Sequence, residues 1–545
     1  MGHEPQEHAG TREAATGRAS SGRRVARALL LSRHLAPALL ISLVLVVSLW
    51  RLHDAPALFW DEGWTLMVAR NWVERGFYGQ LRAGLEVPSG LSAAFPVVAP
   101  TALSFRLLGV GTTQGRLVAL LFSFASLVLL YMLTDALYGK KVASGAVAVA
   151  LLTNALPDAS LWIAGHMLLA EVPMLLFLIS GYLFLSWALR ASIRVLPLAM
   201  LFWAFGIVTK TQMLPFWVVS LAVPLCVSLA RRQWRNVLVL ALSLAGTWGC
   251  WQTVIVLWNR LPLRQPPAGP PLTDLIQASA IVPAGQVRIA TMMLVLVAAL
   301  PAVLGVTYEA SRWLRGVTQD RSSDPRAVVR LALLSLTITW LGWFALLSIG
   351  WPRYLLPSVF LSSMFVSKML SDWTAGFSWS ELMRLASRAI RHRPFDRRAL
   401  RRLVAIAIIG WTILLTSRTL SSFLRSQADT SVQEAAEFLN EHAAPDALVE
   451  GYSSELFFLL DGLYHYPPDH VNVEMTLERY WGEEGAINYD PLIADPDYLV
   501  VCRETDAWDA GPLYDTVSLY QPALQAGAFR LLRTFGPYEV YERQR

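Results

Sequence analysis

The sequence predicts a mainly α-helical, multi-pass membrane protein with a small α/β domain at its C-terminal end. Its 545 residues are 54% hydrophobic and 16% charged, whereas a soluble protein of this length would carry more charge. Long apolar segments follow one another through residues 35–421, and basic residues cluster in the short stretches between them. Residues 422–545 lack such segments and show shorter helix and strand patterns. These three observations divide the chain into a transmembrane part and a soluble C-terminal domain.

The apolar segments predict about eleven transmembrane helices. The first 34 residues are polar, bear arginines and lack apolar periodicity, so we expect a disordered cytoplasmic tail. Because basic loops stay in the cytoplasm, these arginines place the N-terminus inside, and an odd number of spans places the C-terminal domain outside. The expected spans are 35–52, 114–137, 142–158, 172–189, 195–208, 212–230, 236–258, 286–308, 329–350, 354–371 and 403–421.

The first outer loop, residues 53–113, contains the stretch FWDEGWTLMVARNW. Its apolar residues are spaced i, i+3, i+4 and i+8, which predicts a helix with one apolar face. We expect this helix to lie flat at the membrane surface, with its tryptophans at the depth of the lipid headgroups. A second apolar stretch of the loop contains Pro96 and Pro100, is short for a span, and is interpreted as interfacial or re-entrant. The residues of the first face are Trp64, Met67, Val68 and Trp72.

The C-terminal segment, 422–545, is predicted to be a separate extracytoplasmic α/β domain. SVQEAAEFLNEH has helical spacing, with Ala436, Phe438 and Leu439 among acidic residues. ALVEGY, DYLVVC, FRLLRTF and YEVYER have the composition of strands, and a Gly-Pro turn joins the last two.

Composition and motifs exclude several classes of function. The net charge of +6 comes from arginines in short loops between spans, so it sets orientation and does not indicate nucleic-acid binding. Three cysteines, two of them in apolar segments, imply no disulfide framework. The sequence lacks a P-loop, a dinucleotide-binding fingerprint and a zinc-type cysteine pattern, so a soluble nucleotide-sugar donor is less favoured than a lipid-linked one.

Five charged residues fall at the outer ends of the predicted spans: Asp61, Glu62, Glu171, Lys210 and Arg353. Each has an ordinary explanation. Asp61 could be a helix N-cap and Glu62 a first-turn acid. Glu171 could cap the fourth helix, with Pro173 at an early helical position, and Lys210 and Arg353 could snorkel to the headgroups. Charges at span borders are costly, however, and most other outer ends lack them, which favours a functional site. Carboxylates there could take a proton from an attacking acceptor, and cations could neutralise a phosphate leaving group.

Five stretches, in this order, carry a resemblance to a known family. FWDEGWTLMVARNW follows the first span, a long apolar run crosses spans two and three, and AEVPMLLFL, GIVTKTQMLPF and WPRYLLP follow. Together they resemble the GT-C class of membrane glycosyltransferases, in particular the branch with the protein O-mannosyltransferases and the lipid A aminoarabinose transferase, similar to glycosyltransferase family 39. The resemblance implies a polyprenyl-phosphate-linked sugar donor and transfer by single displacement with inversion.

The resemblance also implies a role for each candidate residue. Asp61 takes the position of the catalytic acid, the general base, with Glu62 as its companion, and Glu171 takes that of a second acid, which in relatives is more often Asp. Lys210 and Arg353 fall where basic residues contact the lipid phosphate.

The first outer loop departs from the family pattern. Relatives often carry a Lys-Pro pair there, whereas this chain has GLEVPSG, and Arg82 or Arg106 would have to substitute for the missing lysine. His166, five residues before Glu171, could join the acids around a divalent metal ion, although two carboxylates and one histidine on separate loops are a weak ligand pattern. The sequence therefore assigns no cofactor and leaves a divalent metal open.

The leading hypothesis is a glycosyltransferase of the plasma (inner) membrane with its active site outside. It would transfer a sugar from a polyprenyl phosphate to a cell-envelope lipid, glycan or protein, and the C-terminal domain would help to bind the acceptor or cover the site. One alternative is a secondary transporter or lipid flippase, which predicts charges at the bilayer midplane and broken helices in symmetric positions. Another is a membrane anchor for a C-terminal binding domain, which leaves the charged residues unexplained.

Overall fold

The computed structural model describes the helical and C-terminal parts of the chain. The predicted N-terminal tail lies outside the described residues. The structure describes residues 38–545 except 51, 54, 91–92, 153–155, 157–158, 267–279, 283–284, 320–323, 379, 382, 385–386, 388–396, 426–428, 482–486, 488 and 504–515.

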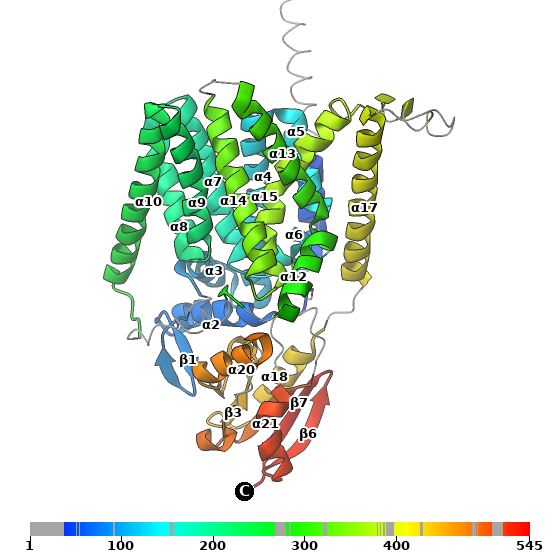
Figure 1. Ribbon diagram of the computed structural model, residues 1–545. Helices are drawn as coiled ribbons and strands as arrows, with labels where there is room; N and C mark the ends of the chain where they lie inside the picture. Colours follow the sequence, from blue (N-terminus) through cyan, green and yellow to red (C-terminus); the bar gives the residue numbers. More distant parts are fainter. Residues whose placement is uncertain are drawn as a thin grey trace, which may run out of the picture.

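A bundle of long apolar helices forms the upper part of the molecule (Figure 1). Within the described residues, seven helices are long and apolar enough to cross a membrane, and an eighth span results if one bent helix pair is counted. The chain is therefore a multi-pass membrane protein, while the count of eleven spans stays a prediction. The seven are α4 (Thr112–Tyr138), α7 (Glu171–Arg190), α9 (Met213–Ala230), α10 (Trp234–Arg260), α14 (Pro325–Leu346), α15 (Leu356–Trp373, continuing the 3-10 turn η3, Pro352–Leu355) and α17 (Arg397–Arg425).

Shorter helices complete the bundle: Ala38–Trp50, α5 (Lys140–Leu152), α6 (Leu161–Ala164) and α8 (Leu196–Thr209, after η2, Ile193–Val195). The predicted eighth span is not one straight helix. It consists of α12 (Gly285–Ala298) and α13 (Leu300–Gln319), which are bent by 79° at their junction. Pro301 explains the break, because proline has no N–H for the helical hydrogen bond and disfavours helical geometry in the residue before it.

Small residues let the central helices pack closely. α15 is the most enclosed of the long helices, and the serines along it take little space at its contacts. Gly305 on α13 lies against this helix, and a Cβ there would stand 2.6 Å from the Val366 backbone nitrogen. α17, by contrast, lies at the edge of the bundle (Figure 1).

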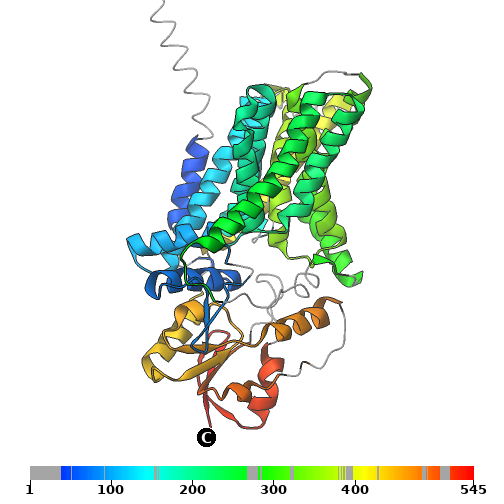
Figure 2. The ribbon, with the colours of Figure 1, turned by 90° about the vertical axis from the view of Figure 1, so that its left-hand side faces the viewer.

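Two helices of the first loop lie across one end of the bundle, which we call the α2 end. α2 (Trp60–Glu74) and α3 (Phe95–Leu108) form this layer, and the hairpin β1 (Gln80–Arg82) and β2 (Leu85–Val87) projects from it. Figures 1 and 2 show the C-terminal domain on the far side of α2. α2 is therefore enclosed by protein on two sides. We predicted that Trp64 faces the lipid headgroups. Instead, it is buried against Phe457 of the C-terminal domain, at 4.6 Å between ring centroids.

The C-terminal domain contains a five-stranded sheet in the order β4-β3-β5-β7-β6. β3 runs parallel to β4 and β5, and β7 pairs antiparallel with β5 and β6. The predicted helix and four strands are confirmed, whereas the short strand β4 was not predicted. The elements are α18 (Ser431–His442), β3 (Leu448–Gly451), α19 (Leu456–Leu459), β4 (Leu463–His465), α20 (Asp469–Trp481), η4 (Pro491–Ala494), β5 (Tyr498–Cys502), α21 (Thr516–Gln525), β6 (Phe529–Phe535) and β7 (Tyr538–Arg543).

Candidate active site

Four of the predicted site residues converge at the α2 end of the bundle, although they come from four separate segments. Arg353 Nη1 lies 2.6 Å from Asp61 Oδ2, and Arg353 Nε lies 3.7 Å from Glu171 Oε1. Lys210 forms an ion pair with the same Glu171 carboxylate. The four side chains make a row of alternating charge, Asp61, Arg353, Glu171 and Lys210, which we call the four-residue cluster.

Element ends bring these side chains to one place. Asp61 lies in the first turn of α2 and Glu171 is the first residue of α7, where the helix dipole favours negative charge. Lys210 ends α8 in an extended conformation, with φ −151° and ψ 104°, so its side chain leaves the helix axis. Arg353 lies in η3, directly after Pro352. Because helices begin or end at all four positions, charges on them meet at the boundary of the apolar bundle.

The cluster is buried on one side and open on the other. The side chains of Arg353 and Glu171 are 6% and 2% exposed, while that of Asp61 is 24% exposed. Buried charges are tolerated when they are paired, and here each buried ion faces an opposite one. Aromatic rings cover the cations: the Tyr354 ring centroid lies 4.7 Å from Lys210 Nζ, and that of Trp351 lies 4.7 Å from Arg353 Cζ. Asp61 is thus the carboxylate that an incoming molecule can reach.

Glu62 does not join the cluster. Its carboxylate is fully buried and pairs with Arg116 of α4, at 2.8 Å between Oε2 and Nη2. It also accepts hydrogen bonds from the backbone N–H groups of Phe59 and Leu168, both at 3.0 Å. This arrangement matches the structural alternative, an acid that holds the first turn of α2, because no oxygen of Glu62 is left to serve Asp61 as a companion.

The three further candidates also lie apart from the cluster. His166 is buried, its Nε2 lies 3.0 Å from the Ser48 carbonyl, and its ring packs on Phe423. Among the described residues there is no group of three or more His, Cys, Asp or Glu side chains that could hold a metal ion. Arg82 lies 3.0 Å from Asp469 of the C-terminal domain, and Arg106 is exposed in the last turn of α3. Among the described residues none of the three bonds to a member of the cluster, and the substitution by Arg82 or Arg106 stays a prediction.

Two arginines were missed by the sequence analysis. Arg116 holds Glu62, as described, and Arg288 on α12 donates a hydrogen bond to the Ser348 carbonyl at 3.1 Å. Nη2 of Arg288 is buried and has no hydrogen-bond partner among the described residues. Ser348 leads into the segment that carries Arg353, so Arg288 is a further cation at the α2 end of the bundle. Both arginines lie within predicted apolar segments, and the rule that such charges are costly would have selected them.

Comparison with known proteins places this geometry in a known architecture. No curated protein matches the chain. A family model described as dolichyl-phosphate-mannose-protein mannosyltransferase matches residues 96–251, less than a third of the chain. The matched segment contains Glu171 and Lys210 but not Asp61 or Arg353.

Solved structures match over a greater length. The structure of ArnT from Cupriavidus metallidurans in the apo state matches with a TM-score of 0.58 and 14% identity, covering 92% of this chain and 97% of that one. The same enzyme bound to undecaprenyl phosphate matches over the same shares, with a TM-score of 0.55 and 13% identity. The chain has a GT-C fold.

A second solved protein also matches the chain. The Archaeoglobus fulgidus oligosaccharyltransferase in its apo form matches with a TM-score of 0.50 and 12% identity, covering 86% of this chain and 70% of that one. The predicted fold class, a mainly α membrane protein with a small C-terminal α/β domain, is confirmed. In this GT-C fold the four-residue cluster lies between the apolar bundle and the C-terminal domain (Figure 1), at the junction of α2, α7, α8 and η3.

Proposed function

We propose that the chain is a membrane glycosyltransferase that transfers a sugar from a polyprenyl-phosphate-linked donor to a cell-envelope acceptor. The observation that carries the proposal is the four-residue cluster, in which an accessible carboxylate and two cations meet at one end of an apolar bundle. The GT-C fold and the match to ArnT bound to undecaprenyl phosphate support it, because a lipid phosphate is the group such a site would hold.

The donor phosphate binds on the cationic side of the cluster. Arg353, Lys210 and Arg288 can offer charge-assisted hydrogen bonds to phosphate oxygens, which are stronger than hydrogen bonds between neutral groups. Glu171 holds Arg353 and Lys210 in place when the donor is absent, because it contacts both. The polyprenyl chain would lie along the apolar helices of the bundle.

Asp61 is the general base of the transfer. An acceptor hydroxyl or amine attacks the anomeric carbon, its proton passes to Asp61, and the bond between that carbon and the phosphate oxygen breaks. The electron pair of this bond stays on the phosphate, where Arg353 and Lys210 stabilise the charge that develops. Arg353 also holds the Asp61 carboxylate through the 2.6 Å contact, so base and leaving-group site are joined by one side chain. Attack opposite the phosphate inverts the anomeric centre.

The orientation of the protein in the membrane is inferred from the charges of its loops. We place the protein in the plasma (inner) membrane, with the N-terminal tail in the cytoplasm and both the site and residues 422–545 outside. This orientation rests on the arginine-rich short loops, which lie at the bundle end opposite α2 under the predicted topology. The C-terminal domain then covers the site from the aqueous side and helps to bind the acceptor.

The proposal is tested by incubating the purified protein in lipid nanodiscs with a panel of polyprenyl-phosphate sugars and measuring release of free polyprenyl phosphate. We expect release with at least one donor, and release slowed by roughly 10²- to 10⁴-fold in the Asp61→Asn variant. A protein that binds these donors but releases no polyprenyl phosphate from any of them, with envelope extract added as acceptor, contradicts the proposal.

A further inference from the structure

The C-terminal domain touches the first turn of α2 through the loop before α19. Ser454 Oγ donates a hydrogen bond to the carbonyl of Trp60, the first residue of α2. Gly63, three residues later, lies so close to this loop that a Cβ would stand 2.2 Å from Ser454 O and 2.7 Å from Glu455 N. Only glycine leaves room for such an approach, so loop and helix are in direct backbone contact.

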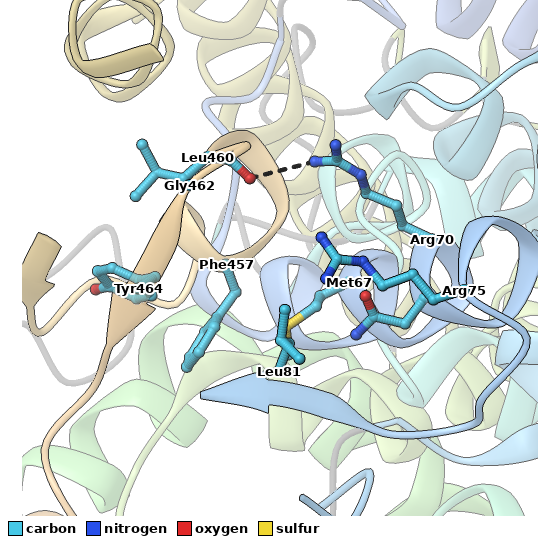
Figure 3. Close-up of a pocket in the computed structure, with 9 residues that line it drawn as sticks. Met67, Arg70, Arg75, Leu81, Phe457, Leu460, Gly462 and Tyr464 are labelled. Carbon is cyan, nitrogen blue, oxygen red and sulfur yellow. Dashed lines mark hydrogen bonds between the residues drawn. The ribbon is translucent and has the colours of Figure 1, made fainter. Parts of the chain in front are cut away.

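The contact continues along α2. Arg70 donates a hydrogen bond to the carbonyl of Leu460, at 3.3 Å (Figure 3). It also donates one to the carbonyl of Phe458, at 2.9 Å, and forms a 2.6 Å ion pair with Asp461. The remaining cavity between Arg70, Met67 and Phe457 has a volume of about 20 Å³, enough for a single water molecule. The C-terminal domain is thus closely seated on the helix that carries Asp61.

Glu455 is an unusual member of this closely packed surface. The residue is only 7% exposed, and its Oε2 is buried without a hydrogen-bond partner among the described residues. The groups that act on it electrostatically are two carboxylates, Asp61 and Glu62 of α2. Two uncharged phenols, Tyr464 of β4 and Tyr538 of β7, also lie within its range. An ionised Glu455 would therefore add a third negative charge beside Asp61 and Glu62, which are paired with Arg353 and Arg116.

Protonation of the Glu455 carboxyl removes its repulsion by these two carboxylates. Burial raises the pKa of the Glu455 carboxyl to about 8, and the negative charges of Glu62 and Asp61 contribute to the rise. When the domain is released from α2, the Glu455 carboxyl loses the influence of Asp61 and Glu62 and part of its burial, so its pKa falls towards the ordinary value of about 4.3. The seated state therefore binds one proton more than the released state across neutral pH.

We propose that Glu455 is a proton-dependent latch, which seats the C-terminal domain on α2 over Asp61 when it is protonated and loosens that contact when it ionises. By linkage, the equilibrium constant for seating falls about tenfold for each pH unit between the two pKa values. The connection to turnover rests on the proposed function. When Asp61 takes the acceptor proton, one of the two charges facing Glu455 disappears, and seating becomes more favourable at that step.

Hydrogen–deuterium exchange on the full-length protein in nanodiscs tests the latch at about pH 5.5 and pH 7.5, with labelling times scaled to the intrinsic exchange rate. In wild type, protection of segments 60–66 and 453–461 should fall at least about tenfold between these pH values, while the core strand β5 keeps its protection. In Glu455→Gln, which imitates the protonated form, both segments should stay protected. Glu437→Gln, an exposed acid on α18, should behave like wild type.

Equal loss of protection in wild type and Glu455→Gln, or no loss in wild type, overturns the latch. If Glu455→Gln does not fold, as shown by exchange in β5, Glu455→Met also lacks the titrating group and must give the same pH-independent protection. Exchange requires no transfer activity. A wild-type protein that shows the pH dependence but transfers no sugar therefore contradicts the proposed function and leaves the latch standing.

Discussion

The two ends of the helical bundle each carry a cluster of charged residues, and the clusters differ in how far apart in the sequence their ion-paired residues are. At the end opposite α2, the ion pairs Glu309–Arg312 and Lys368–Asp372 join residues three or four apart on one helix. Tyr308 donates a 2.8 Å hydrogen bond to Asp372. In the four-residue cluster, Asp61 and Arg353 are 292 positions apart in the chain, and Glu171 and Lys210 are 39 apart. The close ion pairs of the opposite end are local and follow from helix geometry, while a 3.9 Å Arg312–Asp372 contact and hydrogen bonds from tyrosines link its helices. In the four-residue cluster, by contrast, the ion pairs themselves join residues far apart in the chain.

Unsatisfied atoms of charged side chains also distinguish the two ends, although in the part of the chain that the structure describes the uncharged hydroxyls of Thr134 and Ser186 are unsatisfied near the end opposite α2. Glu171 Oε2 and Arg288 Nη2, both at the α2 end, are buried without hydrogen-bond partners among the described residues. No buried side-chain atom of Glu309, Arg312, Lys368 or Asp372 is in that state among the same residues. Each such atom costs about 1–3 kcal/mol, and a polar group of a ligand or a water molecule that bonds to it removes that cost. The unsatisfied atoms of Glu171 and Arg288 support the proposal that the α2 end holds the binding site.

The largest effect that separates the two ends is expected from removing one carboxylate charge at each. Asp61→Asn should lower the rate of sugar transfer by roughly 10²- to 10⁴-fold, the usual contribution of a general base, while the melting temperature stays near that of wild type. Asp372→Asn is the matched control and should leave transfer near the wild-type rate. Rate measurements with a saturating polyprenyl-phosphate sugar check both. Equal losses in the two variants would remove the distinction between the ends.

A second test concerns two neighbouring carboxylates with different surroundings. Arg116→Met leaves the buried Glu62 carboxylate without its ion-pair partner, which should lower the free energy of unfolding by about 3–5 kcal/mol. Combining it with Glu62→Leu should recover much of the loss, because no unpaired charge is then buried. Thermal unfolding in nanodiscs measures both variants. If Arg116→Met unfolds like wild type, Glu62 is not held as the structure places it.

Much of the fold could be read from the sequence, because apolar length and strand alternation are local signals. The strand YEVYER and the helix SVQEAAEFLNEH appear at their predicted places, as β7 and α18. The three-residue strand β4 is too short to give such a signal.

The candidate site was predictable in part. Charges at span ends selected Asp61, Glu171, Lys210 and Arg353, but the role of Glu62 depends on Arg116, 54 positions away. Glu455 belongs to another domain, and its burial against α2 is set by tertiary packing alone. Contacts between residues so far apart in the sequence produce no periodic pattern from which they could be predicted.

Replacing a cation of the four-residue cluster should affect sugar transfer less than replacing Asp61. Lys210→Gln should raise the KM for the lipid-linked donor by roughly 10- to 100-fold, because a charge-assisted hydrogen bond to phosphate contributes about 1.5–3 kcal/mol. The companion variant Lys210→Gln with Glu171→Gln separates donor binding from stability, since it leaves no buried charge unpaired. Lys368→Gln, at the opposite end, should keep the wild-type KM. Steady-state kinetics with varied donor distinguish these outcomes, and an unchanged KM in Lys210→Gln would take Lys210 out of the phosphate site.

The smallest expected effect sharpens the contrast between two buried acids of the C-terminal domain. Glu450 accepts hydrogen bonds from Tyr489 at 2.6 Å and Tyr520 at 3.0 Å and also bonds to His465, whereas Oε2 of Glu455 has no hydrogen-bond partner among the described residues. Burial raises the pKa of Glu450, although its hydrogen bonds to His465 and the two tyrosines oppose the rise. A folded-state pKa above the unfolded value gives stability that is present at low pH and is lost as pH rises towards the folded value.

Glu450→Gln should therefore remove a shallow decline in stability with increasing pH, measured as melting temperature from about pH 5 upwards. The loss of charge should leave seating on α2 unchanged, because Glu450 faces the interior of the sheet domain and not Asp61. Protection of segment 453–461 from hydrogen exchange is the readout that separates the two acids. If Glu450→Gln abolishes the pH dependence of that protection, the titrating group is Glu450, and the assignment of the latch to Glu455 is wrong.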